Sequence, residues 1–152
     1  MGIIEKLKEL NIVLPKMPRP MATYIPAVKT GNLLFLSGML PFKNNELAYI
    51  GKVGARVKEE VGYEAAKLAT LNALAIINEE LGSLDHVKRI VRLTGYVASA
   101  PGFNRQPGVI NGASDILVQI FGEAGRHTRV SVGVSELPLD SPVEVELIVE
   151  VG

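Results

Sequence analysis

The sequence predicts an α+β fold in which two main helices pack on one face of a mixed β-sheet. Three observations support this prediction. A long helical pattern spans Glu59–Leu81, a second helix follows Pro107, and residues 143–151 alternate between apolar and mostly charged side chains. The chain has 152 residues, 47% of them apolar and 21% charged, which suits a single domain over residues 1–152.

The first 20 residues are expected to form a short helix followed by a proline-rich extension. Apolar side chains recur at helical spacing over Ile3–Leu10, with charged residues between them. Pro15, Pro18 and Pro20 then prevent regular backbone hydrogen bonding. This end lacks the uninterrupted apolar run of a signal peptide, so we expect a cytoplasmic protein.

A β-hairpin is expected next. Two extended runs, Ala22–Lys29 and Leu33–Ser37, are separated by residues 30–32, where a glycine stands beside an asparagine. Pro26 lies inside the first run, which favours an edge strand or a bulge there. The turn-rich stretch that follows leaves room for a short strand at Leu47–Ile50.

The middle of the chain predicts a helix, a strand and a second helix. The helix Glu59–Leu81 carries apolar residues on several sides, as helices buried on more than one side do, and Gly82 ends it. Val87–Ser99 is rich in β-branched residues and predicts a long strand, with Gly95 as a candidate bulge. The second helix runs from Pro107 to about Phe121.

Two strands close the chain, Arg129–Val134 and Val143–Val151. In the first, valines alternate with Arg129, Ser131 and Gly133; in the second, apolar residues alternate with glutamates. One face of the sheet is left without a cover, and the long helix has apolar surface on several sides. We therefore expect a symmetric homo-oligomer.

Composition excludes or disfavours several classes of function. The 16 basic and 16 acidic residues balance, and aromatic residues make up only 5%, which disfavours a nucleic-acid partner. No cysteine is present, so disulfides and thiol chemistry are excluded. His86 and His127 lack metal-ligand spacing and there is no nucleotide-binding glycine motif, so we expect neither metal nor cofactor. The most apolar stretch, Ala65–Ile77, is too short to cross a membrane.

Two charged residues are candidates for chemistry. Arg129 has small neighbours on its face of the strand, which would leave room for a ligand, and a guanidinium can hold a carboxylate through two hydrogen bonds. The alternative is an ion pair with a strand glutamate. Glu144 could position or deprotonate a water molecule, and the alternative is a solvated glutamate.

Four further residues are candidates for ligand binding. Tyr24 and Ser37 come from the two arms of the hairpin, and the turn at Gly38 could present backbone N–H groups. The alternative is a strand-end turn with a half-buried tyrosine. Asn111 lies among apolar residues of the second helix, where capping or a link to a strand would explain it equally well. Taken singly, these signals identify no enzyme.

Six short motifs occur in a fixed order. They are Ala22-Thr23-Tyr24, Gly31-Asn32-Leu33-Leu34-Phe35-Leu36-Ser37-Gly38, Leu81-Gly82-Ser83-Leu84-Asp85-His86-Val87, Arg129-Val130-Ser131-Val132-Gly133-Val134, Leu137-Pro138 and Val143-Glu144-Val145-Glu146. This ordered set, spanning residues 21–151, resembles the RidA (YjgF) family of reactive intermediate deaminases, formerly named L-PSP endoribonucleases.

The resemblance implies a chorismate-mutase-like α+β fold assembled as a homotrimer with clefts between protomers. It also implies hydrolysis of 2-imino and 2-enamino acids, such as 2-iminopropionate and 2-aminoacrylate, to 2-oxo acids and ammonia. Family members need no metal or organic cofactor for this reaction. The implied partner is therefore a small 2-imino or 2-oxo acid.

Residue by residue, the resemblance implies two catalytic positions. Arg129 matches the arginine that holds the substrate carboxylate, and Glu144, 15 residues further on, matches the glutamate that places the attacking water. The implied substrate-binding positions are Tyr24, Ser37, Gly38, Asn111 and Ser131. Ser131 stands where the family often has cysteine, and a main-chain carbonyl would serve equally well there.

The chain also departs from the family pattern. Ala22-Thr23 replaces a common Gly-Pro, and about 20 extra residues precede the first motif, as in a longer branch of the family. Two other functions remain as alternatives. One is a non-catalytic trimer that binds a small carboxylate or a partner protein, and the other, disfavoured by the balanced charge, is RNA cleavage.

Overall fold

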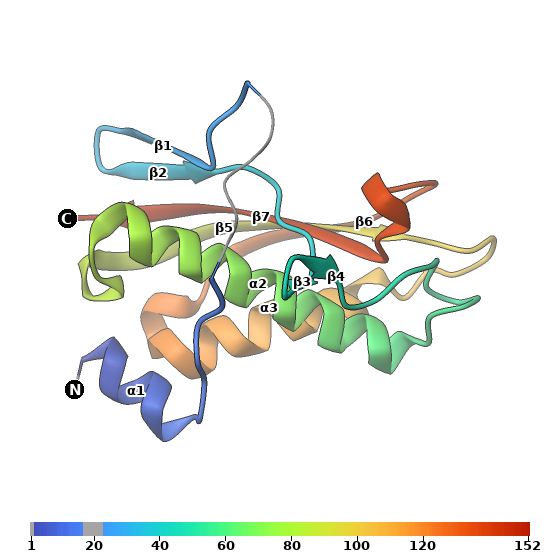
Figure 1. Ribbon diagram of the computed structural model, residues 1–152, viewed down its shortest axis with the longest axis horizontal. Helices are drawn as coiled ribbons and strands as arrows, with labels where there is room; N and C mark the ends of the chain where they lie inside the picture. The colour runs from blue at the N-terminus through green and yellow to red at the C-terminus, as the bar shows by residue number, and fades with distance from the viewer. Residues whose placement is uncertain (1, 17–22) are drawn as a thin grey trace.

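A five-stranded mixed sheet with helices on one face forms the body of the molecule (Figure 1). This computed structural model describes residues 2–16 and 23–152. The strand order is β1-β2-β7-β5-β6, and only β5 and β6 run parallel. The strands are β1 (Ala27–Thr30), β2 (Leu33–Leu36), β5 (Val87–Ala98), β6 (Thr128–Val134) and β7 (Val143–Val151). The expected α+β fold is confirmed.

The first two strands form the expected hairpin, in which Thr30 pairs with Leu33 across a two-residue turn. Gly31 has a φ of 56°, which glycine adopts without steric cost. β1 is an edge strand, and Pro26 lies directly before it, where a missing N–H costs no ladder hydrogen bond. The expected start of the strand at Ala22 lies outside the described residues, and Tyr24 precedes the strand.

A second, two-stranded sheet follows the hairpin. Its strands are β3 (Phe42–Lys43) and β4 (Glu46–Leu47), joined through Asn44 and Asn45, both with positive φ. The sequence predicted a strand at 47–50, so the expectation was correct in kind but displaced. The reason is that two consecutive asparagines accept the left-handed conformation of a tight hairpin turn.

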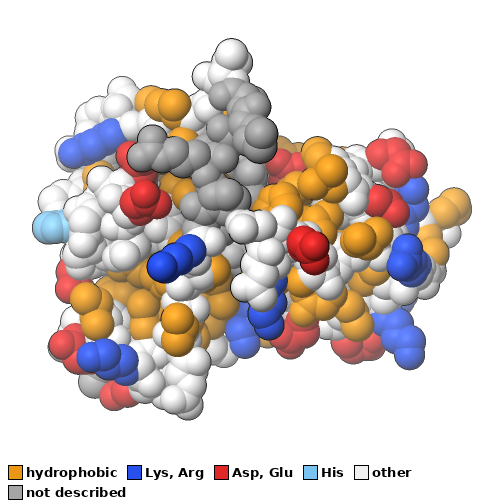
Figure 2. Space-filling view, in the orientation of Figure 1, with side chains coloured by type: hydrophobic (Ala, Val, Ile, Leu, Met, Phe, Trp, Pro, Cys, Tyr) orange, Lys and Arg blue, Asp and Glu red, His pale blue; other side chains and the backbone are white. Residues whose placement is uncertain are grey.

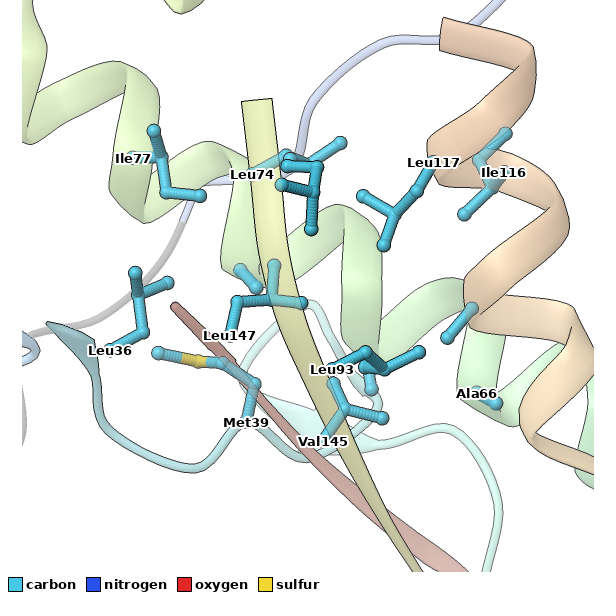
Figure 3. Packing of buried hydrophobic residues seen from close by; sticks show 14 of the residues in the cluster. Leu36, Met39, Ala66, Leu74, Ile77, Leu93, Ile116, Leu117, Val145 and Leu147 are labelled. Carbon is cyan, nitrogen blue, oxygen red and sulfur yellow. The ribbon is translucent and has the colours of Figure 1, made fainter. Parts of the chain in front are cut away.

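Two long helices, α2 (Glu59–Leu81) and α3 (Gln106–Phe121), pack against each other and against the sheet. In Figure 3, Leu74 of α2 lies between Ile77 of the same helix and Leu117 of α3, with Leu147 of β7 below it. The sheet and α3 of the same chain cover most of the apolar residues of α2, while Leu68, Leu71 and Ala75 are only partly buried. The expectation that α2 needs a further cover thus concerns this remaining stripe.

Gly95 of β5 is not a bulge. The pairing of β5 with both neighbours is regular at Gly95, and the irregularities lie between Val87 and Arg92. A Cβ at Gly95 would lie 2.6 Å from Ile110 of α3. The glycine therefore lets α3 approach the sheet closely, which is the other common reason for a glycine inside a strand.

Among the described residues, α1, α2 and α3 lie on one side of the sheet, and none of these three helices covers its opposite face (Figure 1). Phe35, Val130 and Val132 on this open face are 36–40% exposed although they are apolar. The uncovered face expected from the sequence is therefore present. Such a face is the part of the molecule most in need of a partner surface.

The N-terminal helix, α1 (Ile3–Glu9), packs beside α3 and the short helix η1 (Leu84–His86). The backbone N–H of Ile3 donates to Asp85 Oδ1 over 2.7 Å. Pro18 and Pro20 of the expected extension lie outside the described residues. In the described ranges, no helix combines the length and apolar character needed to span a bilayer.

Candidate active site

Arg129 extends from the edge strand β6 toward α3. Its Nη1 donates to Asn111 Oδ1 over 2.7 Å and to Ser114 Oγ over 3.1 Å. Asn111 and Ser114 lie three residues apart on α3 and so share one side of the helix. The helix therefore fixes one end of the guanidinium.

The remaining donors of Arg129 are available. Both hydrogens of Nη1 are used, which leaves Nε and Nη2 without a hydrogen-bond acceptor among the described residues. No carboxylate in residues 2–16 or 23–152 lies within ion-pair distance of the guanidinium. The alternative interpretation, an ion pair with a strand glutamate, is wrong.

The small residues on the Arg129 face of β6 have side-chain neighbours from other parts of the chain. A Cβ at Gly133 would lie 2.7 Å from Gln106 Nε2, so the Gln106 side chain fills that space. The Ser131 hydroxyl is buried, and no described residue hydrogen-bonds to it. Arg129 and Ser131 are thus partly buried on the helix face of β6, and Gly133 on the same face is exposed.

Glu144 lies on the open face of β7, half-buried beside Tyr96 and close to Glu146. Burial raises the pKa of the Glu144 carboxyl above its ordinary value of 4.5, and the negative charge of Glu146 raises it further. The Tyr96 hydroxyl donates to Glu146 Oε1 over 2.7 Å. Glu144 is thus less solvated than an ordinary surface glutamate and holds its proton more strongly.

The turn after β2 lies against Glu144. An ideal Cβ at Gly38 would stand only 2.0 Å from Glu144 Oε2, so only a glycine leaves space for the carboxylate there. The Ser37 hydroxyl donates to the backbone oxygen of Ile25 over 2.7 Å. Tyr24 is 58% exposed, and its hydroxyl has no hydrogen bond within the described part of the chain.

The candidate residues fall into two groups on opposite faces of the sheet. Across the neighbouring strands, Arg129 is aligned with the buried residues Leu93 and Leu147. Glu144 is aligned with Tyr96 and the exposed Val132 in a second such row of paired residues. The two rows are separated by three residues, which is about 10 Å along the strands. Arg129 and Glu144 are also two strands apart, which adds about 10 Å across the sheet. One chain therefore does not bring Arg129 and Glu144 together.

Sequence reasoning missed Ser114 in the Arg129 group and the contact of His127 with it. His127 Nε2 lies 2.9 Å from Ser114 Oγ, and His127 Nδ1 lies 2.6 Å from the Gly125 oxygen. The only signal for Ser114 was its three-residue spacing from Asn111. His127 was weighed for metal binding, and within the described ranges no three potential metal-ligating side chains cluster.

Comparison with known proteins identifies the family. A family model described as YjgF/chorismate mutase-like, with endoribonuclease as a candidate activity, matches residues 5–151. The chain belongs to this family. The expected resemblance is confirmed, and so is the chorismate-mutase-like fold.

Three relatives illustrate the names and the degrees of identity found among the matching proteins. Protein TCP17 of Trypanosoma cruzi is 39% identical over 99% of this chain and 94% of its own length. A crystal structure of a candidate endoribonuclease from Shewanella oneidensis superposes with a TM-score of 0.96 at 35% identity, covering 99% of this chain and 100% of that one. A 2-iminobutanoate/2-iminopropanoate deaminase from Dermatophagoides farinae is 28% identical over 89% of this chain and 91% of its own.

Proposed function

We propose that the protein hydrolyses reactive 2-imino and 2-enamino acids to 2-oxo acids and ammonia in the cytoplasm. The observation that carries the proposal is the guanidinium of Arg129, held by Asn111 and Ser114, with Nε and Nη2 left without an acceptor among the described residues. A planar pair of N–H donors matches the two oxygens of a carboxylate. The relative from Dermatophagoides farinae is named for such an activity, as a 2-iminobutanoate/2-iminopropanoate deaminase.

The reaction makes modest demands on the protein. Water adds to the imine carbon, the resulting carbinolamine loses ammonia, and the C=N bond is replaced by C=O. Arg129 holds the substrate carboxylate, while Glu144 accepts a proton from the attacking water and returns it to the departing nitrogen. A base of this kind typically contributes about 10²–10⁴-fold, most effectively when its pKa lies near the working pH. The raised pKa of Glu144 moves it in that direction.

A homotrimer completes the site in this proposal. Arg129 and Glu144 lie on opposite faces of one sheet, so Arg129 of one protomer has to meet Glu144 of the next. The same contact would cover the exposed Phe35, Val130 and Val132. The association is head-to-tail and closes as a ring, which a three-fold rotation satisfies.

The direct test follows 2-oxo acid release while a pyridoxal-phosphate dehydratase generates 2-aminoacrylate. Wild-type protein should accelerate release, and Arg129→Ala should abolish the acceleration without disturbing the assembly. Arg126→Ala is the matched control, because Arg126 is an exposed cation paired with Glu123. Binding of 2-oxobutanoate without acceleration would indicate a non-catalytic binding module, and the deaminase proposal would then be withdrawn.

A mixing experiment tests the shared site. Arg129→Ala and Glu144→Gln proteins, each inactive alone, should regain about a quarter of wild-type activity after equal amounts are unfolded and reassembled together, because one interface in four then combines an intact arginine with an intact glutamate. No recovery, with mixed trimers demonstrated by mass spectrometry, would place both residues in one protomer's site and contradict the proposal.

The RNA-cleaving alternative has less support. Figure 2 shows acidic and basic side chains interspersed over the side of the molecule in view, whereas RNA-binding surfaces are dominated by basic residues. An RNase assay on the purified protein checks this alternative. Cleavage that survives Arg129→Ala would show an activity independent of the site described above.

A further inference from the structure

Ser114 and His127 form a hydrogen-bonded chain that ends on the guanidinium of Arg129. His127 Nδ1 lies 2.6 Å from the Gly125 oxygen, His127 Nε2 lies 2.9 Å from Ser114 Oγ, and Ser114 Oγ lies 3.1 Å from Arg129 Nη1. The four groups come from α3, the loop after it and β6. None of the motifs that point to the family includes Ser114.

With a neutral His127 ring, the chemistry of each group fixes the direction of every bond in this chain. A carbonyl oxygen only accepts, so His127 Nδ1 donates its hydrogen to Gly125. In the neutral ring Nε2 is then an acceptor, and it takes the hydroxyl hydrogen of Ser114. With its hydrogen committed to His127, Ser114 Oγ presents its lone pairs to Arg129 Nη1.

These hydrogen bonds determine which edge of the Arg129 guanidinium can bind a carboxylate through two parallel donors. Asn111 and Ser114 together occupy both hydrogens of Nη1, so the end formed by Nη1 and Nη2 no longer offers two parallel donors. The edge formed by Nε and Nη2 still does. A carboxylate bound through two hydrogen bonds therefore has one available orientation.

We infer that Ser114 and His127 are positioning residues that hold Arg129 so that it binds a carboxylate through its Nε–Nη2 edge. The inference rests on the proposed function only for the identity of the substrate. Ser114 acts directly on Arg129, and His127 acts through Ser114 by fixing its hydroxyl. Neither residue touches the substrate.

The experiment compares four variants by kinetics and by calorimetric titration with 2-oxobutanoate. Ser114→Ala should raise KM and the 2-oxobutanoate Kd about tenfold while kcat stays within about twofold, because it weakens binding of ground state and transition state alike. His127→Leu should act in the same direction, and His127→Gln should restore part of the loss, since its amide oxygen can accept from Ser114. Gln119→Ala, an exposed change on α3, is the control.

Coupling between the two residues provides a readout that loss of packing would not give. If His127 acts only through Ser114, the double variant Ser114→Ala/His127→Leu should bind 2-oxobutanoate no more weakly than Ser114→Ala alone. Additive losses of affinity would show that His127 acts independently, and the inferred chain would be wrong.

Nitrogen-15 NMR of the arginine side chains separates this inference from the proposed function. In wild type, the Nη1 hydrogens of Arg129 should give a resolved signal that broadens in Ser114→Ala, whether or not the protein is a deaminase. Binding of 2-oxobutanoate should shift the Nε and Nη2 signals more than Nη1. Wild type that binds but does not turn over substrate would contradict the deaminase proposal and leave this inference supported. An unchanged Nη1 signal in Ser114→Ala, or the absence of 2-oxobutanoate binding by wild type, would overturn the inference.

Discussion

The carboxylate of Glu144 rests against Gly38 so closely that a single added methyl group would displace it. An ideal Cβ at Gly38 would lie 2.0 Å from Glu144 Oε2 and 2.9 Å from Cδ. The backbone beside it is held by the hydrogen bond from Met39 N–H to the Val145 oxygen, at 2.7 Å. The turn after β2 therefore determines where the candidate base can stand.

Gly38→Ala should impair activity and leave the fold almost unchanged. Gly38 does not have a positive φ, so alanine fits its backbone, and the clash is with the flexible end of a glutamate side chain. We expect a change in unfolding free energy below about 1 kcal/mol and a fall in kcat of about 10²-fold, as for loss of a positioned base. Urea denaturation and steady-state kinetics measure the two effects.

The control for this prediction is the double variant Gly38→Ala/Glu144→Gln. If the methyl group acts only by displacing Glu144, the double variant should be no less active than Glu144→Gln alone. A further loss relative to Glu144→Gln would mean that Gly38 contributes independently of the glutamate.

Activity should fall in acid as the Glu144 carboxylate takes up its proton. Burial raises the pKa of Glu144 first and the charge of Glu146 raises it second, so the active carboxylate is lost as pH falls through this raised value. Glu146→Gln should move the acid limb of kcat to lower pH, because it removes the neighbouring negative charge. If the acid limb of kcat does not move in Glu146→Gln, a group other than Glu144 is responsible for it.

The raised pKa of Glu144 also predicts in which direction the unfolding free energy changes with pH. Because the folded state binds the Glu144 proton more tightly than the unfolded state does, the ionised carboxylate costs stability at neutral pH. In the dissociated chain, where no partner arginine faces Glu144, Glu144→Gln should therefore be more stable than wild type at pH 7. The difference should shrink as pH falls through the raised pKa and vanish below about pH 4, where the unfolded chain is protonated too.

Much of the fold could be predicted from local pattern. The bounds of Glu59–Leu81 and Val143–Val151 agree with the structure, because helical and alternating periodicities were strong and Gly82 marked the helix end. Gly95 could not be interpreted correctly. A glycine inside a strand indicates a bulge or a close approach, and only the distant Ile110 decides which.

The site was predicted less completely than the fold. The alternation of each strand was correct, but the opposite facing of Arg129 and Glu144 depends on how β6 and β7 align through β5, which no local pattern encodes. The contact of Ser114 with His127 joins a helix to the loop after it, 13 residues apart. Neither residue type is unusual at its position, so no sequence pattern indicated that Ser114 and His127 are in contact.

Two glycines of α3 should respond in opposite ways to alanine. At Gly112 a Cβ would lie 2.0 Å from the backbone oxygen of Tyr63 on α2, and a backbone oxygen cannot rotate away. Gly112→Ala should force the two helices apart and lower the unfolding free energy by about 3 kcal/mol. At Gly108 the nearest atom is 3.3 Å away, at the end of the Glu59 side chain, so Gly108→Ala should be neutral or stabilise by up to about 1 kcal/mol through helix propensity. Urea denaturation of both variants decides the matter, and equal stability would show that the close approach of α2 to α3 does not depend on Gly112.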